Sequence, residues 1–274
     1  MVARADILSW LRAAGVAAGD SLQAMGDFTS FNGRAFAWLF TRRPQTQALV
    51  PVAFSIGYQS VFVIILTGFF IGMVLAVQSY QQFQKLGFST WTGSVINMSV
   101  VRELGPVLAA TMLAGRIGSA MAAELATMRV NEQIDALSCL GVDPIHYLVV
   151  PRLLACVFLI PLLTAFADVA GVAGGSLICV QIYGIEPHYY WQHSRDLIKS
   201  WDLFTGLLKP VFFGGAIAMI ACHRGFRSRA GASGVGRAAT EAFVLSFVAI
   251  LALDFFLALF LQSAHDRWNA LRLM

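Results

Sequence analysis

Charged residues are scarce in this 274-residue sequence. Asp, Glu, Lys and Arg together make up 12% of it, whereas soluble domains carry about a quarter. Hydrophobic residues make up 58% and gather in long blocks. Blocks of about 18 or more apolar residues are typical of membrane-spanning helices. This excludes a single soluble core and predicts an all-α membrane protein.

Motifs for nucleotide, metal and covalent chemistry are also missing. The sequence has no GxxxxGK[ST] phosphate loop, no HExxH pair and no GxSxG turn. Its four cysteines and five histidines show no metal-ligand spacing. We therefore expect no catalytic residue, no cofactor and no metal in this chain. The net charge of +4 comes without a basic stripe interleaved with aromatic residues, so nucleic acid is not an expected partner.

Five apolar blocks are long enough to cross a membrane. They cover approximately residues 50–77, 95–128, 147–182, 203–222 and 242–261. The third block fits either one long span or a hairpin of two. Both readings give 11 basic residues on the cytoplasmic side against 5 outside, so the positive-inside rule does not decide between them. No polar turn interrupts the block, and a turn at membrane depth would leave backbone groups unpaired. We therefore expect five spans and a cytoplasmic N-terminus.

The chain divides into three predicted regions. Residues 1–47 alternate apolar residues with arginines, which is typical of an amphipathic helix lying in the membrane interface. A small soluble cap is the alternative for this region, and a cleaved signal peptide is not expected. Residues 48–262 hold the apolar blocks and form the predicted transmembrane domain, and residues 263–274 form a C-terminal tail.

Ionisable residues inside the apolar blocks are the main candidates for function. A charge at membrane depth is costly, so it faces the interior of a helix bundle or a water-filled path. Arg102 and Glu103 lie in the second block, Asp202 and Lys209 at the start of the fourth, and Asp254 in the fifth. Neighbouring side chains on a helix point about 100° apart, so we expect Arg102 and Glu103 to pair with other helices rather than share one small site. Structural ion pairs that fix helix register are the alternative.

Small residues in the same blocks predict close helix packing. Glycines spaced three or four residues apart let two helix backbones approach each other. The candidates for such packing are Gly68 and Gly72, Gly115 and Gly118, and Gly171 and Gly175.

A short amphipathic helix is predicted in the loop between the second and third spans. The segment contains Asn131, Glu132, Gln133, Ile134, Asp135, Leu137 and Leu140. Asn131 is a suitable N-cap, the acidic residue after it suits the positive end of a helix, and Gly141 is a suitable stop. The isoleucine and the two leucines form an apolar stripe. Such a helix is suited to dock into a cytoplasmic partner, and packing against the chain's own spans is the alternative.

Long stretches of the sequence resemble the MlaE/YrbE permease family. They are GFFIGMVLAVQ (68–78), VVRELGPVLAATMLAGRIGSAMAAELATMRVNEQIDALSCLGVDP (100–144), VVPRLLACVFLIPLLT (149–164), GVAGGSL (171–177) and, more loosely, ATEAFVLSFVAILALDFF (239–256). The resemblance covers most of residues 50–260, and the run from Arg102 to Pro144 is its most specific part.

The resemblance implies the membrane half of an ABC transporter that moves phospholipids between the inner and outer membranes and so maintains outer-membrane lipid asymmetry. It implies a homodimer in the bacterial inner membrane, with cytoplasmic ATPase subunits that bind ATP and Mg²⁺ and with periplasmic MCE-domain lipid-binding proteins. The loop helix at 131–140 would then be the coupling helix that fits the ATPase. The family's charged positions correspond here to Arg102, Glu103, Asp202, Lys209, Arg237 and Asp254, which are candidates for the lipid pathway or for gating.

Some questions stay open at this point. Residues 223–238 are unusually rich in arginine for the family, and they suit either anionic lipid headgroups or a small accessory cytoplasmic protein. A proton-coupled secondary transporter that uses Glu103, Asp168 or Asp254 is an alternative function, although the repeated halves typical of such transporters are missing. A membrane-embedded lipid-modifying enzyme is a second alternative. It would need a cluster of histidines or carboxylates, and the sequence shows none. The direction of transport and the preferred lipid are not predicted.

Overall fold

The computed structural model describes residues 2–41, 46–88 and 91–272, and the described chain is built almost entirely of helices. The α-helices are α1 (Val2–Thr41), α2 (Thr46–Lys85), α3 (Thr92–Ser99), α4 (Gly105–Leu113), α5 (Ser119–Val130), α6 (Gln133–Cys139), α7 (Val150–Leu177), α8 (Pro187–Leu197), α9 (Ser200–Phe226) and α10 (Ala232–Arg272). Four π-helical turns lie between them, namely η2 (Val100–Leu104), η3 (Ala114–Gly118), η4 (Ile145–Val149) and η5 (Ile178–Ile182).

The five predicted spans are confirmed. Five helical stretches are long and apolar enough to cross a membrane, and they run from Ala48 to Lys85, Thr92 to Val130, Ile145 to Ile182, Ser200 to Phe226 and Ala232 to Arg267. The third is one uninterrupted helical stretch of 38 residues, made of η4, α7 and η5, rather than a hairpin. The last helix continues through most of the predicted C-terminal tail, because α10 ends only at Arg272.

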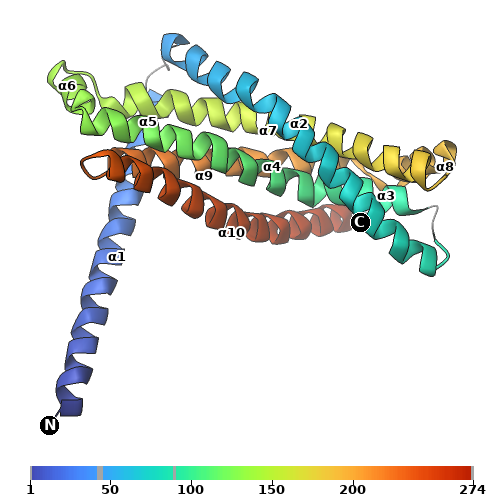
Figure 1. The fold of residues 1–274 in the computed structure, drawn as a ribbon, viewed down its shortest axis with the longest axis horizontal. Coiled ribbons are helices and arrows are strands. Elements are labelled where there is room, and N and C mark those ends of the chain that lie inside the picture. Colours follow the sequence, from blue (N-terminus) through green and yellow to red (C-terminus); the bar gives the residue numbers. More distant parts are fainter. Residues whose placement is uncertain (1, 42–45, 89–90, 273–274) are drawn as a thin grey trace.

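The spans lie side by side and give the bundle two distinct ends (Figure 1). The short helix α6 and the turn from α9 into α10 lie at one end, called here the α6 end. Helix α8 and the connection from α2 to α3 lie at the opposite end, called here the α8 end. Helix α1 crosses the bundle at the α6 end and projects away from it at a steep angle to the spans (Figure 1). That direction suits a helix lying along the membrane surface.

The interior of the bundle is formed mainly by the second, third and fourth spans. In the most apolar stretch of α9, 56% of the residues are buried, whereas the value is 28% for α2 and 17% for α10. Large apolar side chains such as Phe62 of α2 and Phe260 of α10 are therefore exposed on the outer helices. Membrane lipid or another apolar protein surface has to cover them.

Helices α2 and α7 approach each other through glycine. A Cβ atom added at Gly68 would lie 2.9 Å from the Cα atom of Ala167, and one added at Gly72 would lie 2.9 Å from the Cα atom of Gly171. Gly171 and Gly175 of α7 also face the second span, where an added Cβ atom would meet side chains at 2.9 and 3.2 Å. The remaining pair is less tightly enclosed. An added Cβ atom at Gly115 or Gly118 would meet a side chain at 3.4 or 3.3 Å.

Candidate functional site

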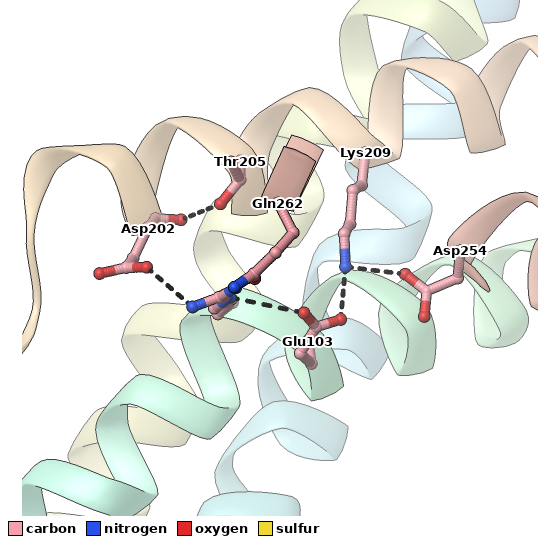
Figure 2. Close-up of polar contacts among 7 residues, drawn as sticks. Glu103, Asp202, Thr205, Lys209, Asp254 and Gln262 are labelled. Atoms are coloured by element: carbon pink, nitrogen blue, oxygen red, sulfur yellow. Dashed lines mark hydrogen bonds and ion pairs between the residues drawn. The ribbon is translucent and has the colours of Figure 1, made fainter. Parts of the chain in front are cut away.

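A cluster of polar side chains joins the second, fourth and fifth spans (Figure 2). We call it the ion network, and its members are Arg102, Glu103, Asp202, Lys209, Asp254 and Gln262. The first two lie on the π-helical turn η2, the next two on α9 and the last two on α10. Single π-helical turns inside α-helices are frequent at functional sites, because the extra residue changes the direction of nearby side chains.

Lys209 is the most deeply buried charge of the network. The residue is 1% exposed, and its ammonium group contacts a carboxylate oxygen of Glu103 and lies 3.0 Å from a carboxylate oxygen of Asp254. It follows the start of α9 by nine residues, so it lies about 13 Å into the span. An isolated ammonium group at that depth would be strongly unfavourable, and the two carboxylates compensate it.

Arg102 links the network to the α8 end. One of its terminal nitrogens lies 3.5 Å from a carboxylate oxygen of Asp202, and the other donates a hydrogen bond of 2.6 Å to the side-chain oxygen of Gln262. Its Nε atom lies 3.6 Å from Glu103. Arg102 and Glu103 therefore lie in one network, against the expectation that they do not share a site, but each pairs with another helix as expected. Arg102 pairs with Asp202 of α9 and Gln262 of α10, whereas Glu103 pairs with Lys209 of α9.

Asp202 is fixed by the beginning of α9 as well as by Arg102. Its carboxylate accepts a hydrogen bond of 3.0 Å from the backbone N–H of Lys199, which satisfies one of the free donors at the helix start. The hydroxyl of Thr205 donates to the backbone carbonyl of Asp202 at 3.0 Å (Figure 2). The position of this carboxylate is thus set by local helix geometry before Arg102 pairs with it.

The outer part of the network can be reached from the surface. The side chains of Arg102 and Glu103 are 31% and 41% exposed, whereas that of Lys209 is 2% exposed. A cavity of about 260 Å³ at the α8 end is lined by Arg102 and Asp202 together with Trp201 and other residues. The network contains two cations and three carboxylates, so a bound molecule would meet charges of both signs beside aromatic and aliphatic walls.

Arg237, the remaining charged candidate, lies apart from the network. It follows the α9–α10 turn at the α6 end, where its Nε atom lies 2.7 Å from Glu241. Arg224 of α9 pairs with the same carboxylate at 3.2 Å. The structure therefore brings five of the six predicted charges together and leaves the sixth at the other end of the bundle.

The predicted loop helix is present as α6, but it begins differently from the prediction. Asn131 ends α5, with its backbone N–H bonded to the carbonyl of Thr127, and so it does not cap α6. Glu132 precedes α6 in a left-handed conformation with φ of 58°, and no side chain caps the helix. The N-cap prediction is wrong because the second span continues for one more turn and uses Asn131 at its own end. Gly141, with φ of 76°, follows the helix as predicted.

The apolar stripe of α6 is divided between the bundle and the surface. Ile134 is 4% exposed and belongs to the main core, and Leu137 packs against that core. Leu140 is 77% exposed. Gln133 and Asp135 are exposed, and Asp135 forms an ion pair with Arg129 of α5. The isoleucine therefore anchors α6 to its own chain, while the polar face and the last leucine remain available to a partner.

Several polar contacts were not predicted from the sequence. Gln262 lies two helical turns after Asp254, and this spacing was the only available signal. The indole nitrogen of Trp38 on α1 donates to Asp143 after α6 at 3.0 Å, which ties α1 to the loop helix. At the α8 end, the buried hydroxyl of Tyr190 donates to Asn97 at 3.0 Å, and burial raises the pKa of this phenol. Within the described residues, no group of three or more His, Cys, Asp or Glu is arranged to hold a metal ion.

Comparison with known proteins matches the chain to membrane permeases. The family profile described as Permease MlaE matches residues 49–260. A probable ABC transporter permease protein of Synechocystis sp. is 43% identical over 212 residues, which are 77% of this chain and 81% of that protein. The intermembrane phospholipid transport system permease protein MlaE of Haemophilus influenzae is 35% identical over 239 residues, covering 84% of this chain and 92% of that protein. The chloroplastic protein TRIGALACTOSYLDIACYLGLYCEROL 1 of Arabidopsis thaliana is 39% identical over 211 residues, which are 77% of this chain and 60% of that protein.

Proposed function

Because this chain belongs to the MlaE permease family, we propose that it is the inner-membrane permease subunit that moves phospholipids between the inner and outer membranes of a bacterial envelope. The observation that carries the proposal is the ion network. It is a charged cluster inside a membrane bundle, reachable from one end and bordered by a cavity. Charges at membrane depth mark the pathway of a polar group through the bundle.

In the proposed mechanism, the headgroup of one phospholipid enters at the α8 end and meets Arg102 and Glu103, the two most exposed charges of the network. A zwitterionic headgroup offers a phosphate to the guanidinium and an ammonium to the carboxylates, so it suits a site that holds both signs. The acyl chains lie along apolar surfaces of the spans. Lys209 stays buried and holds the three spans together through its two carboxylate partners.

We further propose that ATP hydrolysis in a separate subunit drives the movement. The exposed face of α6, with Gln133, Asp135 and Leu140, is the docking surface for that cytoplasmic ATPase, which binds ATP and Mg²⁺. The α6 end is then cytoplasmic, the N-terminal helix α1 lies on the cytoplasmic surface, and the α8 end faces the periplasm and an MCE-domain lipid-binding protein. The exposed apolar faces of α2 and α10 suit a second copy of the chain in a homodimer. A small accessory cytoplasmic protein is a further candidate partner.

The test is phospholipid transfer by the complex purified from its native host, reconstituted into vesicles and supplied with ATP. We compare the native permease with Arg102→Gln and Glu103→Gln, which keep side-chain size and remove charge. The expected result is a transfer rate reduced by about tenfold or more in each variant, equivalent to at least about 1.4 kcal/mol in the transport barrier. Transfer that persists after collapse of the proton gradient and stops without ATP would separate this function from a proton-coupled transporter.

A matched control removes a charge outside the network. Arg195 is an exposed arginine on α8, at the same end of the bundle, so Arg195→Gln repeats the change at a site that the mechanism does not use. Its transfer rate should match that of the native complex. Unchanged transfer in both network variants, with the complexes intact, would overturn the assignment of the lipid pathway.

A further inference from the structure

A second hollow lies between α1, the last turns of α9 and the middle of α10. It has a volume of about 490 Å³, and we call it the corner pocket. Residues from all three helices line it, including Met25 of α1, Arg224 of α9 and Val248 of α10. On α9 it begins 11 residues beyond Lys209 at Ile220, which corresponds to about 17 Å along the helix, and on α10 it extends to Ala252, two residues before Asp254. No residue that lines the corner pocket is a member of the ion network.

One wall of the corner pocket is an apolar stripe on α10. Leu245, Val248, Ala249 and Ala252 line it, and their spacing of three and four residues puts them on one face of the helix. Leu245 is 37% exposed and Val248 is 57% exposed, so the stripe opens to the surroundings of the bundle. These residues belong to a helix long and apolar enough to span a membrane, so the stripe suits the acyl chain of a lipid.

The opposite side of the corner pocket is strongly basic. Arg224 and Arg227 line it, and they also line an adjoining hollow of about 280 Å³ at the α9–α10 turn, together with Arg229 and Arg237. Two carboxylates lie among the four arginines, since Asp27 pairs with Arg227 at 2.7 Å and Glu241 pairs with Arg224 and Arg237. Four arginines against two carboxylates leave a net charge of +2 over the two adjoining hollows.

An unsatisfied polar atom also borders the corner pocket. His223 is 7% exposed and lines it, and its ring packs edge-on against Phe28 and Phe31 of α1 with centroids 5.2 and 5.4 Å apart. Within the described structure, the Nε2 atom of this histidine is buried without a hydrogen-bond partner. Buried polar atoms are paired in nearly all proteins, so an orphaned one next to a hollow indicates a ligand that completes it.

We propose that the corner pocket binds one anionic glycerophospholipid from the membrane leaflet at the α6 end. The phosphate lies at Arg224 and Arg227 within reach of His223, and an acyl chain lies along the α10 stripe. A cationic rim beside an apolar, lipid-facing groove at the end of a span fits this class of molecule. The bound lipid joins α1 to α9 and α10. This inference goes beyond the proposed function, because the lipid is a resident ligand and not the transported cargo.

The test measures lipid binding to the purified chain in mild detergent, without ATPase or ATP. Phosphatidylglycerol is titrated and the bound lipid is counted by native mass spectrometry, with zwitterionic phosphatidylcholine of the same chain length as the comparison without net charge. Arg224→Gln combined with Arg227→Gln should weaken phosphatidylglycerol binding at this site by about tenfold or more, as expected for two lost charge-assisted contacts. The control double variant, Arg195→Gln with Arg267→Gln, removes two exposed arginines near the other end and should bind normally.

A second variant leaves every charge in place. Ala252→Trp fills the apolar part of the corner pocket, while Leu251→Trp adds the same ring at the neighbouring exposed position that does not line it. Ala252→Trp should lose phosphatidylglycerol binding and Leu251→Trp should retain it. This pair keeps the test decisive if the arginine variants weaken the attachment of α1 and fail to fold.

The remaining outcomes identify the ligand or reject the proposal. Inorganic phosphate at millimolar concentration should not displace the lipid. If phosphate displaces it and Ala252→Trp still binds normally, the natural ligand of the site is a free anion and not a lipid. Equal binding to all variants would overturn the site. Lipid held at the ion network is recognised separately, because it is lost in Arg102→Gln and retained in Ala252→Trp. The proposal of a lipid site in the corner pocket and the proposal of a transport function can therefore be rejected independently of each other.

Discussion

Replacing the two carboxylate partners of Lys209 should destabilise the protein more than replacing Lys209 itself. Its side chain is 2% exposed, whereas those of Glu103 and Asp254 are 41% and 23% exposed. Removing one partner of a buried ion pair leaves an uncompensated charge and costs about 3–5 kcal/mol. We expect that loss in the unfolding free energy of a double variant, Glu103→Gln with Asp254→Asn, because the ammonium group cannot reach water. Lys209→Met should cost less, because both carboxylates are partly exposed.

Thermal unfolding of the purified variants in the same detergent measures this difference. A triple variant, with all three residues replaced by Met, Gln and Asn, should recover most of the stability that the double variant loses, because no charge is left unpaired. A lower melting temperature for Lys209→Met than for the double variant would contradict the argument.

At the residue scale, the sequence predicts the members of the ion network better than their partners. Lys209 and Asp254 stand out because each interrupts an apolar block, where a charge is costly. The contact between Arg102 and Glu103 is not predicted, because it depends on the π-helical turn η2, and an apolar sequence carries no signal for such a turn. Gln262 is missed because an uncharged polar residue near the end of a span is ordinary.

At the scale of helices, the close packing of α2 on α7 predicts that Gly72 cannot be replaced by alanine without loss of stability. A Cβ atom at Gly72 would lie 2.6 Å from the carbonyl carbon of Gly171, and this neighbour is backbone that cannot rotate away. Gly72→Ala should therefore destabilise the protein by about 1–3 kcal/mol, as overpacking does. Gly57, on the same helix, would place its Cβ atom 3.8 Å from the methyl groups of Leu159. Gly57→Ala should be neutral or stabilising by up to about 1 kcal/mol, because alanine favours helix.

The two alanine variants are compared by thermal unfolding in detergent, and each carries the same added methyl group. Equal melting temperatures would mean that α2 and α7 can separate without cost. The close contact would then not be a determinant of the fold.

The sequence predicts which segments form helices, but it does not predict the residues at which the helices begin and end. The first apolar block ends near Val77, but α2 continues to Lys85, because the glutamines that follow are good helix formers and carry the helix beyond the apolar region. The choice of Asn131 as the start of α6 fails for a related reason. Asparagine suits either end of a helix, and the preceding span uses it.

At the scale of the whole molecule, the proposed docking helix and the ion network lie at different ends and are joined by continuous helices. Helix α9 carries Lys209 of the network and is followed, 18 residues later, by its C-cap Arg227 beside α1, a separation of about 27 Å. The second span likewise runs from η2 to Arg129, which pairs with Asp135 of α6. An event at α6 can reach the network by movement of these rigid helices.

The expected consequence is that a surface change at α6 stops transport without disturbing the fold. Leu140→Asp puts a charge on a side chain that is 77% exposed, so the melting temperature of the purified chain should stay the same. Co-purification of the ATPase and ATP-driven lipid transfer should both fall by about tenfold or more, because a charge replaces an apolar contact at the interface. Ile134→Asp makes the same replacement at a position that is 4% exposed, and it should lower the melting temperature itself. Full ATPase binding by Leu140→Asp would mean that the docking surface lies elsewhere. The proposal that movement of α6 is transmitted to the ion network would then be rejected.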